Sequence, residues 1–238
     1  VYKRQLLLSA NSQHPNGLGN KSGFLGRNLM FHIIALAAGS FDQTLHTYRG
    51  RPIIANFMDF VVDSKFDYRG GIVELGGSQH PISEAMNYFT NGITGSVHKA
   101  MMRDSPYRRK IVTATMIGED MPVWTNRVDL DQSIKDIYGF PVARITYKNH
   151  QRDLDMANHF LPKLKEIVDA AGAASSMTVN LNIESGGIPN TQHILGTARM
   201  GDDPKASVTD PYGKFHDLDN LYCADGSANG GIYFARCH

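Results

Sequence analysis

The chain has 238 residues, of which 42% are hydrophobic and 20% charged, so it can bury a sizeable core as one large domain or two small ones. Twenty-four Lys and Arg stand against 23 Asp and Glu, and no basic run occurs, so we expect neither a nucleic-acid partner nor a clear membrane contact. The apolar stretch at residues 31–38 is far too short to cross a bilayer.

The first residues of the chain do not look like the start of a protein. The chain opens without Met and runs directly into an apolar run at residues 6–8, so we expect a truncated N-terminus. No leader peptide is visible, and no localisation is predicted. Only two cysteines occur, Cys223 and Cys237, and two unpaired thiols are the favoured interpretation.

In chain order, a glycine-rich loop at residues 16–23 comes first, and β-branched or alternating segments then predict strands. The clearest helix covers residues 153–171, with Pro162 as a possible kink and Gly172 as its C-cap. We therefore expect an α+β fold with an antiparallel sheet backed by helices. The other expected elements are strands at 53–62, 109–117, 123–130 and 141–147, a helix at 81–88 and a turn at 131–139.

The block of residues 193–201, His-Ile-Leu-Gly-Thr-Ala-Arg-Met-Gly, is the first candidate site. A lone histidine beside apolar residues is more often structural than catalytic. Here the glycines would let the backbone approach a flat ligand, and an imidazole, with a pKa near ~6.5, suits proton transfer from an alcohol at neutral pH. His193 is therefore the candidate catalytic base.

The second candidate site is the apolar run 221–224, which stops at Asp225-Gly226-Ser227. A strand that ends in this way is typical of the ligand-binding edge of an open α/β sheet. If a helix starts after Gly226, its free N–H groups could hold a phosphate. Asp-Gly is also a common turn dipeptide, so an ordinary turn remains the competing interpretation.

Together these blocks resemble the C-terminal signature of the glucose–methanol–choline (GMC) oxidoreductases. The segment Gly17-x-Gly19-Asn20 through Gly26-Arg27-Asn28-Leu29-x-x-His32 is similar to the family segment that leaves the flavin domain. Asn126-Arg127-Val128-x-Leu130-Asp131 resembles the hairpin of the family's substrate domain. The match extends from about Leu6 to Ser227 and is weakest between residues 33 and 121.

The resemblance implies an FAD-dependent oxidoreductase that acts on the CH–OH group of a small-molecule alcohol, such as a sugar or polyol. His193 would accept the hydroxyl proton while a hydride passes to the flavin, and Asp225 and Gly226 would contact the cofactor. It also implies a division into residues 1–32, from the FAD-binding domain, 33–190, the substrate-binding domain, and 191–238, which return to the FAD-binding domain. The two flanks, remnants of that α/β domain, should then meet in space.

Two departures from the family pattern matter. The Gly-x-Gly-x-x-Gly motif that cradles the diphosphate of FAD does not occur, so the chain alone should bind FAD poorly and need an N-terminal FAD-binding segment as its partner. The second catalytic His or Asn that follows Asp-Gly-Ser in the family is also missing, and neither Asn229 nor His238 sits in the required motif. A catalytically inactive binding or structural domain derived from the same family is therefore the main alternative.

Other enzyme classes fit less well. A serine hydrolase needs Gly-x-Ser-x-Gly, but Asp225 and Asn229 occupy the two glycine positions around Ser227. No His-Glu-x-x-His occurs, and the cysteines and histidines lack finger-like spacing, so no metal site is expected.

Overall fold

The computed structural model describes residues 2–61, 71–77, 80–180, 191 and 193–228. Asn229, Cys237 and His238 lie outside these residues. The chain divides into two compact units. Unit 1 comprises Val1–His32, Glu119–Leu154 and Asn182–His238, and unit 2 comprises Ile33–Gly118 and Asp155–Leu181.

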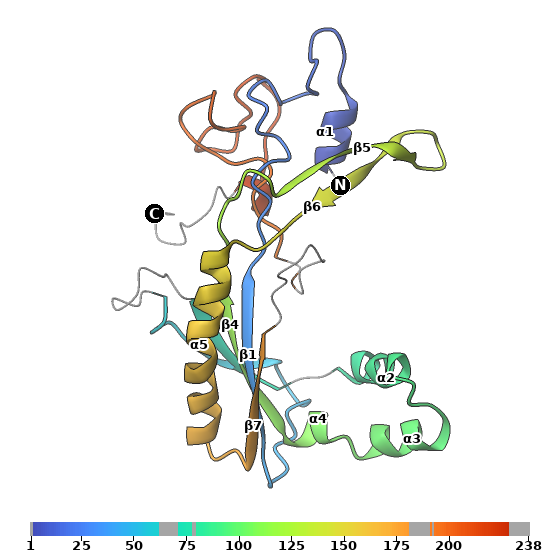
Figure 1. Ribbon diagram of the computed structural model, residues 1–238, viewed down its shortest axis with the longest axis vertical. Helices are drawn as coiled ribbons and strands as arrows, with labels where there is room; N and C mark the ends of the chain where they lie inside the picture. Colours follow the sequence, from blue (N-terminus) through green and yellow to red (C-terminus); the bar gives the residue numbers. More distant parts are fainter. Residues whose placement is uncertain (1, 62–70, 78–79, 181–190, 192, 229–238) are drawn as a thin grey trace. The chain divides into compact units, whose positions relative to one another are not determined.

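Unit 2 is built on a five-stranded antiparallel sheet (Figure 1). Its strand order is β2-β3-β4-β1-β7, so β1 pairs with both β4 and β7. The expected α+β fold with an antiparallel sheet is confirmed. The strands are β1 (Ile33–Ser40), β2 (Ile53–Phe57), β3 (Gly71–Gly76), β4 (Ile111–Gly118) and β7 (Ser175–Asn180).

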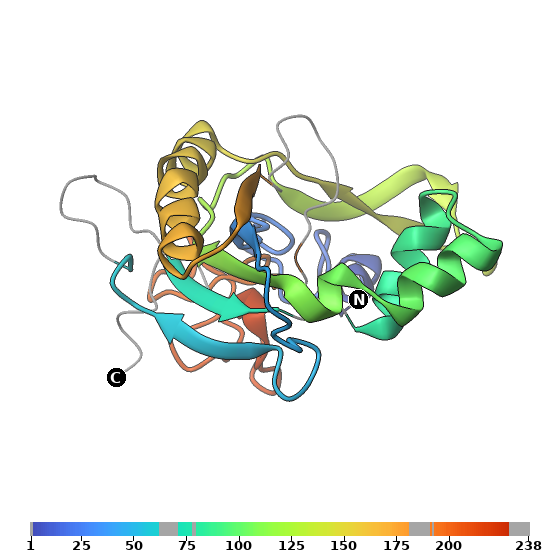
Figure 2. The same cartoon turned by 90° about the horizontal axis from the view of Figure 1, so that it is seen from below.

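The core of unit 2 lies between this sheet and helix α5 (Gln151–Ala170), which runs along one face of the sheet (Figures 1 and 2). Burial alternates along β1, because every second side chain points toward the helix. Phe160 and Leu164 of the helix are fully buried against Ile33 and Ala35 of the strand. The expected backing of the sheet by a helix is thereby confirmed.

Helix α5 continues through Pro162 without a break. A proline removes one backbone hydrogen bond of a helix. Because Pro162 is exposed, its ring lies away from the side chains that α5 packs into the core. The helix ends as expected at Gly172, whose φ of +91° is left-handed and suits glycine. The N–H of Ala173 then donates to the carbonyl of Val168, at 3.2 Å.

Among its described residues, unit 2 also contains the short helices α2 (Pro81–Thr90), α3 (Gly95–Arg103) and α4 (Pro106–Lys110). The expected helix at 81–88 is confirmed. The strand expected at 109–117 starts later, because the side chain of Ser105 accepts a hydrogen bond from Arg108 N–H and caps α4. Buried Glu84 of α2 pairs with Arg108 at 2.5 Å and so joins α2 to α4.

Unit 1 contains helix α1 (Tyr2–Leu8), the hairpin of β5 (Arg127–Lys135) and β6 (Pro141–Thr146), and the single 3-10 turn η1 (Gly226–Ala228) among its described residues. The strand expected at 123–130 begins only at Arg127. The buried side chain of Asn126 replaces the missing ladder there: it accepts from Lys148 N–H at 3.0 Å and donates to the Lys148 carbonyl at 2.9 Å.

The β5–β6 hairpin belongs to unit 1 by its contacts, together with the two terminal segments. The functional division at residues 32/33 and 190/191 stays a prediction. No helix in the described part of the chain is long and apolar enough to cross a membrane.

Candidate active site

Two segments far apart in the sequence are joined within unit 1. Four backbone hydrogen bonds connect residues 26–30 to residues 195–198. Met30 and Leu195 exchange both of their bonds at 3.0 Å, which makes them an antiparallel pair. Gly26 N–H donates to the Thr197 carbonyl at 2.7 Å, and Thr197 N–H donates to the Arg27 carbonyl at 3.0 Å.

This register places His32 opposite His193. In an antiparallel pair, the residue two positions after one partner faces the residue two positions before the other. His32 follows Met30 by two and His193 precedes Leu195 by two, and their side chains do meet. The Nδ1 atoms of the two imidazoles lie 2.7 Å apart, and the ring planes are inclined by 85°.

The environments of the two imidazoles differ. The side chain of His32 is partly buried, whereas His193 is exposed. Burial, and secondarily the neighbouring His193, lower the pKa of His32 to about 4. At neutral pH His32 is therefore an uncharged ring, in which one nitrogen donates a hydrogen bond and the other accepts one. The tautomer decides which nitrogen does which.

A left-handed turn directly follows His193. Gly196 has a φ of +73°, and a β-carbon there would lie 1.9 Å from the carbonyl oxygen of Asn28. The next residue, buried Thr197, also has a positive φ of +69°, which is a strained conformation for a β-branched residue. The glycine of the motif His-x-x-Gly thus serves the close approach of two backbones of this chain.

A buried carboxyl network lies beside the His32 segment. Asp120 accepts from Phe31 N–H at 2.9 Å and from the Tyr147 hydroxyl at 2.6 Å. Burial raises the pKa of Asp120 to about 8, and a hydrogen bond with Asp153 acts in the same direction. Burial likewise raises the pKa of Asp153, which accepts from His150 N–H at 3.1 Å. The network holds the residue next to His32 in place.

The Asp225-Gly226-Ser227 turn lies against the His193 segment. Ala198 N–H donates to the Ser227 carbonyl at 2.9 Å, and a β-carbon on Gly226 would lie 2.6 Å from the Ile194 carbonyl. The structure thus brings His193, Asp225 and Gly226, the three residues expected from the sequence, into one region of unit 1.

Exposed Asp225 is held by partners within the chain. Partial burial tends to raise its pKa, but the N–H of Ser227, at 2.8 Å, and the ammonium of Lys3, at 3.2 Å, hold the pKa of this carboxyl below its usual range. An ionised, exposed carboxylate suits the hydroxyl groups of a polyol chain such as the ribityl part of FAD. The acceptor oxygens of Asp225 therefore fit that part of the cofactor.

The fit does not extend to the diphosphate. Residues 221–224 form an isolated bridge between Tyr222 and Lys214 in place of the expected strand, and η1 is only three residues long. Within this turn the N–H groups of Ser227 and Ala228 already donate to Asp225. In residues 226–228, the condition for a phosphate site, a helix start with free N–H groups, is therefore not met.

The two flanks of the chain meet in unit 1, as expected. Leu6 and Leu7 of α1 pack in one apolar cluster with Leu221 and Cys223. The same segments line a cavity of about 330 Å³ that also contains Phe215. Cys223 has a free thiol. Whether these flanks derive from an FAD-binding domain stays a prediction.

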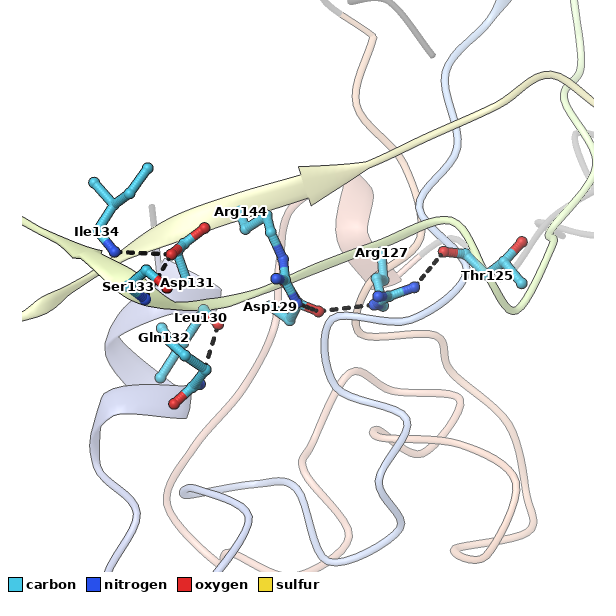
Figure 3. A network of polar contacts seen from close by, with 9 residues as sticks. All are labelled: Thr125, Arg127, Asp129, Leu130, Asp131, Gln132, Ser133, Ile134 and Arg144. Atoms are coloured by element: carbon cyan, nitrogen blue, oxygen red, sulfur yellow. Dashed lines mark hydrogen bonds and ion pairs between the residues drawn. The ribbon is translucent and has the colours of Figure 1, made fainter. Parts of the chain in front are cut away.

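The hairpin of unit 1 carries a network of charges at its base (Figure 3). Asp129 of β5 accepts from Arg144 Nε at 2.9 Å and from Arg127 Nε at 2.8 Å, and the bond from Arg144 is the main reason that the pKa of Asp129 lies below its usual range. Asp131 accepts from the N–H groups of Ser133 and Ile134, both at 2.8 Å. This local turn explains why β5 loses register with β6 after Leu130.

His32 and the carboxyl network are the site residues that the sequence did not reveal. His32 ended the Gly-Arg-Asn-Leu motif and received no role, because its partner lies 161 residues later. Asp120, Tyr147 and Asp153 carry no local motif. In the described residues, no group of three or more His, Cys, Asp or Glu side chains could hold a metal ion.

Comparison with known proteins agrees with the motifs. Residues 122–232 match the model of the family described as GMC oxidoreductase. The chain is 32% identical to the 2-methyl-1,2-propanediol dehydrogenase of Mycolicibacterium austroafricanum over 94% of this chain and 41% of that protein. It is 32% identical to the paromamine 6'-oxidase of Streptomyces fradiae, over 93% of this chain and 38% of the relative. It is 27% identical to the gluconate 2-dehydrogenase flavoprotein of Pantoea cypripedii, over 94% of this chain and 38% of that protein.

The chain thus spans about two fifths of the length of these curated relatives. The match covers both units, because more than nine tenths of this chain is aligned in each case.

Proposed function

Because the chain belongs to the GMC oxidoreductase family, we propose that the protein is an FAD-dependent oxidoreductase acting on the CH–OH group of an alcohol, such as a sugar or polyol. The relatives support this substrate class, since their names include a propanediol dehydrogenase, a paromamine oxidase and a gluconate dehydrogenase flavoprotein. The observation that carries the proposal is the exposed ring of His193 beside the turn at Asp225 and Gly226.

Oxidation of an alcohol to a carbonyl compound requires removal of a hydroxyl proton and a hydride from carbon. Bound FAD would supply the hydride acceptor. His193 would take the hydroxyl proton at Nε2, since its Nδ1 is engaged by His32. The Asp225 carboxylate would accept hydroxyl protons of the ribityl chain in hydrogen bonds and so fix the position of the cofactor near His193.

The test is the rate of flavin reduction by substrate in the intact protein that contains this chain. A positioned general base contributes about 100- to 10,000-fold, so His193→Ala should slow anaerobic stopped-flow reduction by that factor. The electron donors are 2-methyl-1,2-propanediol, gluconate and paromamine, chosen from the relatives. Flavin content should be unchanged, because the imidazole does not anchor the cofactor.

The matched control is His80→Ala, which removes an exposed histidine of unit 2 that makes no side-chain cap bond to α2. It should reduce flavin at the wild-type rate. Equal rates for the wild type and His193→Ala would remove His193 from the mechanism. A protein with bound FAD that no alcohol reduces would instead support the inactive binding domain.

A further inference from the structure

The contact between His32 and His193 is a hydrogen bond between two nitrogens of the same kind. The two Nδ1 atoms are 2.7 Å apart and the ring centroids 4.8 Å apart. The difference is close to two ring radii, so the two nitrogens lie nearly on the line between the rings. One Nδ1 must carry a proton and the other a lone pair, because two lone pairs or two protons at this distance would repel each other.

The direction of this bond decides what His193 can do. If His32 donated, His193 would be neutral with its own proton on Nε2, and no lone pair would remain for a substrate. If His193 donates, its Nε2 keeps the lone pair and points away from His32. Only the second arrangement leaves a base on the exposed side of the ring.

We infer that His32 is a positioning residue whose neutral Nδ1 accepts the Nδ1–H of His193 and thereby holds His193 in the tautomer with a free Nε2. This role rests on the proposed function, because it matters for catalysis only if His193 is the base. The same bond would strengthen when His193 becomes an imidazolium, since a charged donor forms a shorter and stronger hydrogen bond.

The surroundings of His32 suit an acceptor that stays uncharged at neutral pH. Partial burial and the adjacent ring of His193 keep its pKa near 4, so it does not compete for the proton taken from substrate. The backbone that leads into His32 is fixed: Met30 pairs with Leu195, and Phe31 N–H donates to Asp120. His32 therefore presents its ring from a rigid segment, which a positioning role requires.

The first test reads the tautomer and needs no activity. In the intact protein labelled with ¹⁵N-histidine, long-range ¹H–¹⁵N spectra at pH 8 distinguish Nδ1–H rings from Nε2–H rings. The signal that disappears in His193→Ala is the signal of His193. His193 should be an Nδ1–H ring in the wild type. It should revert to Nε2–H in His32→Leu, which has no acceptor, and stay Nδ1–H in His32→Asn, whose side-chain oxygen can replace Nδ1.

The second test uses the same variants in stopped-flow flavin reduction. Removal of a residue that orients a functional histidine typically costs about 10- to 100-fold, so His32→Leu should lower the reduction rate by that factor with KM and FAD content little changed. His32→Asn should recover most of the rate. A merely structural histidine would instead lower the melting temperature in both variants and leave the rate per folded molecule unchanged.

The outcomes separate the two proposals. An Nε2–H ring for His193 in the wild type, or a tautomer that is the same in His32→Leu, overturns the positioning role of His32. A normal reduction rate in His193→Ala removes His193 as the base, whatever tautomer the spectra show. Bound FAD that no alcohol reduces in the wild type overturns the proposed function. Recovery of the tautomer and the rate together in His32→Asn supports the positioning role.

Discussion

Single buried residues of the site set how the protein responds to pH. Asp120 is almost completely buried, and the hydrogen bonds that it accepts from Phe31 N–H and the Tyr147 hydroxyl do not offset the cost of burying its charge beside the carboxyl of Asp153. Deprotonation would place two negative charges side by side away from water, which low-dielectric surroundings strongly disfavour. The folded protein therefore retains a proton here that the unfolded chain would release.

We predict that this proton makes the protein less stable as the pH rises. The pKa of Asp120 goes from its ordinary value of 3.8 to about 8 on folding, so the folded state binds more protons between pH 4 and pH 8. Its contribution to stability is complete below about pH 4 and is lost as the pH rises toward 8. The loss should be of the order of a few kcal/mol, at no more than about 1.4 kcal/mol per pH unit.

The matched variant is Asp120→Asn, which keeps an oxygen for Phe31 N–H and Tyr147 and offers Asp153 a donor at every pH. Urea denaturation at pH 5, 6.5 and 8 should give a flatter dependence for Asp120→Asn than for the wild type. Parallel curves would show that Asp120 titrates alike in the folded and unfolded states.

At the scale of elements, a glycine decides whether two segments can meet. Gly196 combines a left-handed φ with an approach to the Asn28 carbonyl that leaves no room for a β-carbon. Gly23 also has a positive φ, of +75°, but nothing lies within 4 Å of the place a β-carbon would take. The pair separates the cost of the backbone conformation from the cost of the close approach.

Gly196→Ala should therefore destabilise the protein by about 2–5 kcal/mol, from left-handed strain and forced separation of the backbones. Gly23→Ala should cost only about 1–2 kcal/mol from the strain alone. Thermal and urea unfolding of both variants measure the difference. Equal losses would mean that residues 26–30 can move away from residue 196 at no cost.

Helix α5 offers a second test at this scale. Pro162 is exposed, so Pro162→Ala restores a backbone hydrogen bond and changes nothing in the core. A proline inside a helix costs about 3 kcal/mol, partly offset by about 0.4–1 kcal/mol from the stiffer unfolded chain. We expect Pro162→Ala to raise the free energy of unfolding by about 1–3 kcal/mol. Glu166→Ala, at an exposed position one turn later, should change it little; no gain from Pro162→Ala would show that α5 already accommodates the ring.

The elements were predictable where their pattern is local. Helix α5 and strand β6 have periodic apolar residues or turn signals, and both were expected close to their observed bounds. Strand β5 was expected at 123–130, and its second half, residues 131–135, lies where a turn was expected. Strand β1 was missed because its sequence, Ile-Ile-Ala-Leu-Ala-Ala-Gly-Ser, is apolar almost throughout and hides the alternation that its burial shows. Strand β7 is mostly exposed at the edge of the sheet, so it carries little hydrophobic signal.

The site was predictable only in part, for a related reason. His193, Asp225 and Gly226 stand in motifs that a single segment displays. His32 becomes part of the site through the register between residues 30 and 195, and Asp120 through a contact with Phe31 across 89 residues. Pairings over such distances depend on the fold as a whole.

For the whole molecule, the question is how much of a cofactor site these 238 residues provide. Asp225 suits a polyol chain, but the turn after Gly226 has two of its N–H groups already bonded and the sequence has no Gly-x-Gly-x-x-Gly. We predict that the chain alone retains little FAD through gel filtration after reconstitution. Stoichiometric flavin absorbance in the protein peak would show that other residues hold the diphosphate.

Because Met30 pairs with Leu195, the number of residues between His193 and Leu195 decides on which side of the segment the imidazole lies. Side chains alternate between two faces of an extended segment, so a single-residue insertion or deletion between His193 and Leu195 would turn the imidazole away from His32. Two inserted residues would restore the face but shift the ring along the segment by roughly 7 Å. Changes of chain length that a surface loop absorbs would, at this point, remove the ring from its partner.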